Sequence, residues 1–211
     1  MSTFFKVWIN PRGVIRNKIE KEATVQPLGK YLLLAYISGV FSIMFSFEME
    51  APFSATMFSL SVFLGAIVTS VLSVFLMPVL FKWFGSWVGG RGSLAEVRVA
   101  VIYTQVLPQI FIGILLLPFI LLIGENFFLV YENSLEPQLS GLQNWALLVA
   151  SLLLILLFVW QFIVMLQGLG EAHGFSAWKS LLVYIIFTVL LTIVLVIVGL
   201  ILALTIGVLF I

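Results

Sequence analysis

The chain has 211 residues, of which 63% are hydrophobic and only 9% are charged, and its mean hydropathy is +1.25. A soluble domain carries about 25% charged residues, so this composition excludes an ordinary soluble fold and indicates a surface that faces lipid. The sequence has no cysteine, which excludes disulfides, thiol nucleophiles and zinc–thiolate sites.

The first 30 residues are predicted to form a basic amphipathic arm on the cytoplasmic leaflet. Asn10 and Pro11 are typical of a helix start, with the asparagine as N-cap and the proline in the first turn. We expect this helix to run to about Ala23 and to stop before Pro27. Three of its cations are candidate lipid or partner contacts: Arg12, Arg16 and Lys18. Anionic lipid would add about 1 kcal/mol per basic residue, and a docking role for a cytoplasmic partner is the alternative.

Five apolar segments follow the arm, and together they predict an all-α, five-helix membrane bundle over residues 31–211. The predicted spans are 31–47, 57–81, 101–123, 145–166 and 181–211. A crossing takes about 20 residues, so the first span needs a short extension back to Leu28. The last would measure roughly 46 Å as a straight helix. Because the hydrocarbon core is about 30 Å thick, we expect tilt, a bend or a projecting end to absorb the excess.

The positive charges are distributed unequally between the two sides of these spans. All ten lysines and arginines lie before the first span, between the second and third, or between the fourth and fifth. The other two connections carry only acidic charges: Glu48, Glu50, Glu125, Glu132 and Glu136. Cationic loops stay in the cytoplasm, so we expect the N-terminus inside and the C-terminus outside. This predicts a multi-pass protein of the plasma or inner membrane.

Two glycine-rich loops complete the expected cytoplasmic face. Loop 85–93 ends in a capping box, which opens a helix, but it lacks the ending of a phosphate-binding loop, so we expect a flexible connector. Loop 168–176 holds Glu171 and His173, which are too few for a metal site, and we expect the histidine to be solvated. The candidate partner or lipid contacts of this region are Arg91, Glu96 and Arg98.

The spans themselves contain polar residues but no central charge, which argues against a proton relay or ion path built on carboxylates. The candidate interhelical polar contacts are Gln105, Gln109 and Gln161. Amides in lipid seek partners across helices, and a polar substrate path is the alternative interpretation. Pro78, Pro108 and Pro118 each remove a backbone hydrogen bond and are expected to kink their helices.

Several short motifs follow one another along the chain. They are Trp8-x-x-Pro11, the stretch Gly-Gly-Arg-Gly-Ser-Leu-x-Glu-Val-Arg at 89–98, Leu107-Pro108, the loop Gly-Leu-Gly-Glu-Ala-His-Gly at 168–174, and Trp178-Lys179. In these motifs the chain resembles the prokaryotic form of the Yip family, the Ypt/Rab-interacting membrane proteins, over nearly its whole length. The resemblance implies a five-span bundle with a cytoplasmic N-terminus and an external C-terminus.

Eukaryotic members of that family are linked to prenylated GTPases, vesicle traffic and membrane shaping. This chain lacks their long soluble N-terminal region and its Asp-Leu-Tyr-Gly-Pro type motif, so a GTPase partner is not expected. The resemblance offers no catalytic residue, and we expect no cofactor, metal or nucleic acid.

These observations lead us to expect a non-enzymatic membrane scaffold, adaptor or membrane organiser. It would act through its cytoplasmic face on anionic lipids, on another membrane protein or on a second copy. The alternative is a small-molecule transporter, or a membrane subunit of one, whose path would be lined by Gln105 and Gln109.

Overall fold

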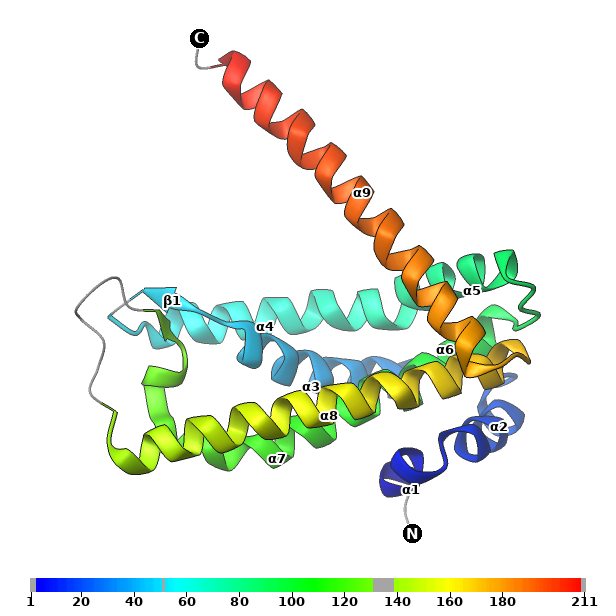
Figure 1. The fold of residues 1–211 in the computed structure, drawn as a ribbon, viewed down its shortest axis with the longest axis horizontal. Helices are drawn as coiled ribbons and strands as arrows, with labels where there is room; N and C mark the ends of the chain where they lie inside the picture. The colour runs from blue at the N-terminus through cyan, green and yellow to red at the C-terminus, as the bar shows by residue number, and fades with distance from the viewer. Residues whose placement is uncertain (1–2, 51, 131–138, 210–211) are drawn as a thin grey trace.

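The structure is a computed structural model that describes residues 3–50, 52–130 and 139–209. It is a bundle of long apolar helices with the arm packed at one end (Figure 1). Five helical segments are long and apolar enough to cross a membrane: Leu28–Ser46, Ala55–Trp87, Leu94–Phe127, Gly141–His173 and Ala177–Thr205. The predicted all-α fold with five spans is therefore confirmed.

The arm forms two helices, α1 (Thr3–Ile9) and α2 (Pro11–Glu22). Asn10 caps α2 as predicted, because its side-chain oxygen accepts a hydrogen bond from the backbone N–H of Gly13 at 3.0 Å. The arm packs on the bundle, and both α1 and α2 contact the third and fourth spans. Two of its apolar side chains, Val7 and Ile15, are fully buried.

The first span is α3, and the next two spans are each built from several helical pieces. The elements are α3 (Leu28–Ser46); α4 (Ala55–Val71), η1 (Leu72–Leu76) and α5 (Met77–Trp87); then α6 (Leu94–Val101), η2 (Ile102–Val106), α7 (Leu107–Ile123) and η3 (Gly124–Phe127). Helices α3 and α4 pack closely, and a Cβ on Gly39 would come within 3.0 Å of the Ala66 backbone. Ser93 and Glu96 form the predicted capping box at the start of α6.

Elements η1 and η2 are π turns, and each lies just before a proline, Pro78 or Pro108. A proline removes one backbone N–H and crowds the carbonyl of the residue four positions earlier. A wider π turn relieves that crowding while the helix continues. In the second span the affected carbonyl is that of Val74, and it accepts a hydrogen bond from Arg98 Nε at 2.9 Å.

The last two spans are α8 (Gly141–His173) and α9 (Ala177–Leu209). Helix α8 ends at Gly174, whose φ of +71° is left-handed. The predicted loops at 168–176 and 85–93 are therefore shorter than expected. Residues 168–173 belong to α8 and residues 85–87 belong to α5, so the prediction of a loop is wrong for both stretches. At the opposite end, β1 (Met49–Glu50) pairs in parallel with β2 (Leu129–Val130).

Helix α9 leaves the bundle after its first turns (Figure 1). Val183 and Phe187 are buried against the bundle, whereas every side chain from 191 to 205 is exposed. The helix passes through Gly199 without a break. The excess length predicted for the last span is thus present as one uninterrupted helix that projects away from its neighbours.

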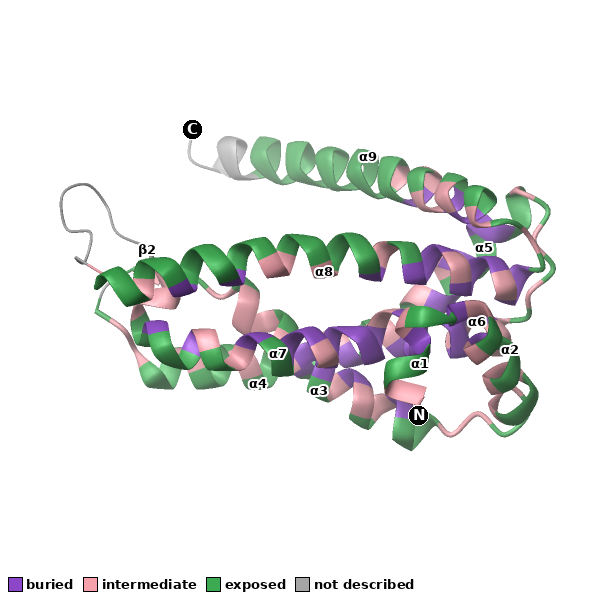
Figure 2. Ribbon diagram, turned by 60° about the horizontal axis from the view of Figure 1, so that its bottom comes forward, coloured by how far each residue is buried: buried purple, intermediate pink, exposed green. Residues whose placement is uncertain are grey.

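Burial is concentrated at the end of the bundle that carries the arm (Figure 2). One large cluster of buried side chains joins the arm, α3, α5, α6, η2, α8 and α9 there, and it includes Ile15, Tyr31, Phe81, Val97, Ile102 and Val183. Most side chains of α8 beyond this region are exposed or half-buried. The arm-bearing end is therefore the most closely packed part of the molecule.

Candidate functional site

All lysines and arginines of the chain lie at the arm-bearing end, which we call the basic end. It comprises the arm up to residue 27, the α5–α6 connection, the α8–α9 connection and the helix turns that adjoin them (Figure 1). Its cations are Lys6, Arg12, Arg16, Lys18, Lys21, Lys30, Lys82, Arg91, Arg98 and Lys179. Glu48, Glu50 and Glu125 lie toward the opposite end, and Glu132 and Glu136 lie outside the described residues.

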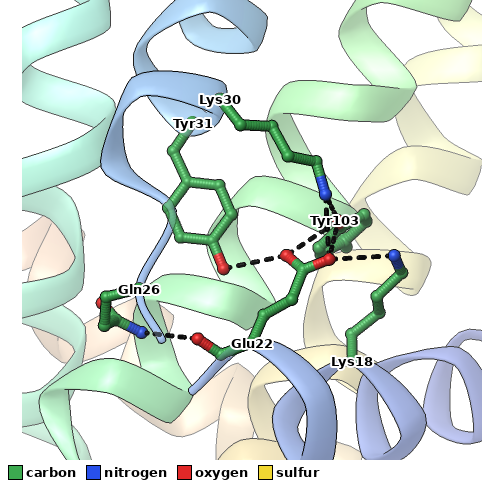
Figure 3. Close-up of polar contacts among 6 residues, drawn as sticks. All are labelled: Lys18, Glu22, Gln26, Lys30, Tyr31 and Tyr103. Carbon is green, nitrogen blue, oxygen red and sulfur yellow. Dashed lines mark hydrogen bonds and ion pairs between the residues drawn. The ribbon is translucent and has the colours of Figure 1, made fainter. Parts of the chain in front are cut away.

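Glu22, at the end of α2, is the centre of a polar network that ties the arm to two spans (Figure 3). Its carboxylate accepts hydrogen bonds from Lys30 Nζ at 2.8 Å, from Lys18 Nζ at 3.0 Å and from the Tyr31 hydroxyl at 3.0 Å. The Tyr103 hydroxyl donates to the same carboxylate at 2.8 Å. Only 13% of the Glu22 side chain is exposed, so this network joins α2 to α3 and η2 at a nearly closed site.

The network changes the ionisation of the groups at its centre. Burial alone would raise the pKa of Glu22, but hydrogen bonds from Lys30, Tyr103, Lys18 and Tyr31 outweigh burial and lower its pKa to about 2. Burial opposes the charged form of Lys18, yet its hydrogen bonds with Tyr103 and Glu22 raise its pKa. The carboxylate and the ammonium groups therefore stabilise each other in their charged forms.

The stability of the folded protein is therefore expected to depend on pH through Glu22. An unfolded chain would bind a proton at this carboxyl near pH 4.3, whereas the folded chain binds it near pH 2. The contribution of Glu22 is complete above about pH 5 and is lost as the pH falls from about 4.5 toward 2. Thermal unfolding in detergent, followed between pH 6 and pH 3, measures this contribution. The difference in stability between the unmodified protein and Glu22→Gln should shrink as the pH falls. A constant difference would contradict the expectation.

Arg98 connects the same region to the second span. Its guanidinium donates to the Val74 carbonyl and to Gln26 Oε1, and it lies 5.9 Å from the ring centroid of Phe75. Gln26 has a φ of +46°, and its side-chain amide donates to the backbone carbonyl of Ala23 at 3.2 Å. Arg98 thus satisfies a carbonyl that Pro78 leaves without its helical donor.

A second set of contacts joins the arm to the end of α8. Arg16 Nε lies 2.7 Å from Glu171 Oε1, and this hydrogen bond, together with the attraction of the carboxylate, raises the pKa of Arg16. Arg12 Nη1 lies 3.6 Å from Glu171 Oε2, and its Nη2 donates to the Phe175 carbonyl at 3.2 Å. The structure therefore brings together Glu171 and the two arm arginines.

His173 is buried, with only 3% of its surface exposed, so the prediction of a solvated histidine is wrong. Its Nε2 lies 3.2 Å from the Phe81 carbonyl, and because a carbonyl only accepts, Nε2 carries the proton. The Phe175 ring stacks on the imidazole at 5.0 Å between centroids. The remaining nitrogen, Nδ1, is buried without a hydrogen-bond partner.

Glycines at the end of α5 and in the α5–α6 connection make room for this histidine. A Cβ on Gly85 would lie 2.4 Å from His173 Nε2, and one on Gly90 would lie 2.5 Å from Nδ1. A Cβ on Gly92 would lie 2.5 Å from the Ala172 carbonyl, and the Arg91 N–H donates to the His173 carbonyl at 3.2 Å. The stretch predicted to be a flexible connector is therefore packed around the end of α8.

Some cations of the basic end are left free for other contacts. In the part of the chain that the structure describes, five exposed cations have no ion-pair partner: Lys6, Lys21, Lys82, Arg91 and Lys179. Arg91 and Lys179, together with Glu96 and Glu171, line an open hollow of about 530 Å³ beside His173. Of the predicted contact residues, Arg91 is the one with a free charged group, since Glu96 serves its capping box and the others make the internal contacts above.

The three predicted glutamines lie deeper among the spans. Gln161 Nε2 donates to the Gln105 backbone carbonyl at 3.0 Å and so connects α8 to η2. Gln109 is 9% exposed, and all three line one cavity of about 370 Å³ between the helices.

The sequence reasoning missed Glu22, Gln26, Lys30, Tyr31 and Tyr103, which form the main network of the basic end. One local signal was available, since Lys18 and Glu22 are four residues apart on one helix and such pairs attract. Tyr31 and Tyr103 carried no such signal, because nothing local indicates that the start of α3 and the η2 turn converge on the arm.

The chain matches a known protein family. A family model described as the Yip1 domain matches residues 5–209, which include the arm and all five apolar helices. Neither a curated protein nor a solved structure matches the chain.

Proposed function

Since the chain belongs to the Yip1 domain family, we propose that it is a non-enzymatic multi-pass membrane protein that acts as a scaffold, adaptor or membrane organiser. The protein lies in the plasma or inner membrane. Its working surface is the basic end, which faces the cytoplasm. This orientation follows from the rule that cationic segments resist translocation.

The observation that carries the proposal is that the basic end is preformed and still has unpaired cations. The Glu22 network and the Arg16–Glu171 pair hold the arm against three spans, so few groups need to be ordered on binding. The free charges are spread over the arm, α5, the α5–α6 connection and the first turn of α9. A rigid surface of this kind suits a partner with negative charge.

The partner that fits best is an anionic lipid surface. Lys6, Lys18 and Lys21 line an open groove of about 600 Å³ beside α1 and α2. Two apolar side chains near this groove, Phe5 and Ile9, are 50% and 74% exposed. Cations beside exposed apolar side chains are typical of segments that bind at the lipid headgroup level.

We expect the double variant Arg91→Gln, Lys179→Gln to weaken retention of anionic lipid. Each cation near a membrane surface contributes about 1 kcal/mol, so the loss of two should reduce retention about 30-fold. The measurement is the ratio of phosphatidylglycerol to phosphatidylcholine that copurifies with the full chain, read by native mass spectrometry.

The matched control removes two charges from the opposite end of the bundle, with Glu48→Gln and Glu50→Gln. It should leave the lipid ratio unchanged. Equal lipid ratios in the double variant and the unmodified protein would remove the support for lipid binding through Arg91 and Lys179. Crosslinking in native membranes, before and after the same substitutions, tests a protein partner on this surface.

A transport role is the second candidate, because the cavity among the spans brings Gln105 and Gln109 to one place. Uptake of a solute by the purified protein in liposomes, lost in Gln105→Ala or Gln109→Ala, would support it. Absence of uptake for a panel of small neutral solutes would count against it.

A further inference from the structure

The short helix α1 packs further from the charged end of the bundle than α2 does. Its aromatic rings contact Phe111 of α7, and the centroid of that ring lies 5.5 Å from Phe4, 6.1 Å from Phe5 and 5.1 Å from Trp8. In addition, Trp160 Nε1 of α8 donates to the Trp8 carbonyl at 3.0 Å. Figure 1 and Figure 2 both show α1 nearer than α2 to the middle of the bundle.

The first span sets the position of the hydrocarbon core along the bundle. Helix α3 has 19 residues, or about 28 Å, which matches a hydrocarbon core of about 30 Å. Lys30 lies in the first turn of this helix, and Glu48 follows its last residue by two positions. A charged side chain inside the core is costly, so both residues stay at its borders. The core therefore fills the length between Lys30 and Glu48, and the bundle cannot shift far toward either side.

Two separate spans place α1 inside this core. Lys30 Nζ lies 2.6 Å from the Tyr103 hydroxyl, so Tyr103 marks the border at the basic end. Phe111 comes eight residues later in the same span, which is about 12 Å along a helix. Trp160 comes eleven residues before Glu171, which is about 16 Å. The headgroup layer is only about 5–8 Å thick on each side, so both partners of α1 lie below it.

The exposed side chains of α1 suit this depth. Phe5 and Ile9 are four residues apart, which puts them on one side of the helix, and they are 50% and 74% exposed. Lys6 is the only charged residue of α1, and it lines the same groove as Lys21 of α2. A lysine in this position buries its apolar stem and carries its ammonium group to the headgroups. Helix α1 thus offers two apolar side chains to lipid tails.

We propose that α1 is inserted in the cytoplasmic leaflet, where Phe5 and Ile9 contact the acyl chains of lipids below their headgroups. The partner is the hydrocarbon of the bilayer, because α1 packs on α8, whose own apolar side chains are exposed at this depth and deeper, as at Leu152 and Leu156. The inference rests on the proposed function only for the side of the membrane. It goes beyond the binding of anionic headgroups, since a contact with acyl chains does not depend on charge.

The test uses the full chain in nanodiscs of phosphatidylcholine alone. Because the chain has no cysteine, a nitroxide on the single cysteine of Ile9→Cys reports on one position. Its collisions are measured with oxygen, which concentrates among acyl chains, and with a nickel chelate, which stays in water. The Ile9 label should collide with oxygen and lose access to the chelate, as should a label at Leu152→Cys, whose residue is 60% exposed on α8. A label at Glu20→Cys, on the exposed side of α2, should show the opposite pattern.

Access of the chelate to the Ile9 label at the rate seen at Glu20 would overturn the proposal, because α1 would then lie in water. Low access of both reagents would also overturn it, since protein, such as a second copy, would then cover this side of α1. Phe5→Cys repeats the measurement if Ile9→Cys fails to fold. The nanodiscs hold no anionic lipid, so an inserted α1 together with an unchanged lipid ratio in Arg91→Gln, Lys179→Gln would contradict the headgroup contacts alone.

Discussion

Replacing Glu22 with alanine is expected to release the arm from the bundle and to destabilise the protein by about 3 kcal/mol. The substitution removes one carboxylate that receives hydrogen bonds from two ammonium groups and two phenolic hydroxyls. Tyr31 is fully buried, and Tyr103 is 3% exposed, so their hydroxyls would lose a partner that water cannot easily replace. The variant should unfold at a lower temperature in detergent, and its arm should become sensitive to protease.

Glu20→Ala is the matched control, because Glu20 is an exposed glutamate of the same helix. It should change stability by less than about 0.5 kcal/mol. Glu22→Gln should fall between the two, since the amide keeps an acceptor but loses the charge that attracts Lys18 and Lys30. If Glu22→Ala protects the arm from protease as well as Glu20→Ala does, the network does not hold the arm.

The sequence was sufficient to predict the five spans, because a run of apolar residues long enough to cross the bilayer is typical of a membrane-spanning helix. The ends of the helices were harder to place. Helix α8 continues to His173 although its apolar run fades near Leu166, because the arm and the α5–α6 connection cover its polar turns. Hydropathy indicates where the apolar, lipid-facing part of the chain ends. The helix itself ends later, at Gly174, which takes a left-handed backbone conformation.

The role of Arg98 shows why charged residues near a span are difficult to assign from sequence. Arg98 was predicted to contact lipid or a partner, yet its guanidinium donates to a carbonyl 24 residues earlier. That carbonyl, on Val74, lacks its helical donor because Pro78 is four residues later. The rule for proline identifies the carbonyl that needs a donor, but only the packing of α6 on η1 identifies the donor.

The glycines at the end of α5 and in the α5–α6 connection illustrate a signal that was present and misread. Gly89 has a φ of +85°, so its backbone conformation favours glycine, whereas Gly85, Gly90 and Gly92 have no such φ. These three are needed for space and not for flexibility, since a Cβ on each would strike the end of α8. Four glycines in eight residues are compatible with a flexible loop or with close packing against another group. The group that they pack against is the single histidine of the chain.

Gly85→Ala is expected to destabilise the protein by about 2 kcal/mol, although alanine normally stabilises a helix by about 1 kcal/mol relative to glycine. Gly85 lies within α5, and its added Cβ would sit 2.4 Å from the His173 ring. The ring has little freedom to move, because Phe81 holds its Nε2 and Phe175 stacks on its face. Thermal unfolding of the full chain in detergent shows directly whether the substitution raises or lowers stability.

Gly29→Ala provides the matched control, since Gly29 is a helical glycine of α3 with open space around its Cβ position. It should leave stability unchanged or raise it. In the double variant Gly85→Ala, His173→Ala, the clash is removed with the ring, so the two substitutions should couple favourably by about 2 kcal/mol. Additive effects, or an increase in stability from Gly85→Ala alone, would mean that α5 does not pack closely against His173. The basic end would then lack one of the contacts that make it rigid, and a partner would have to order it on binding.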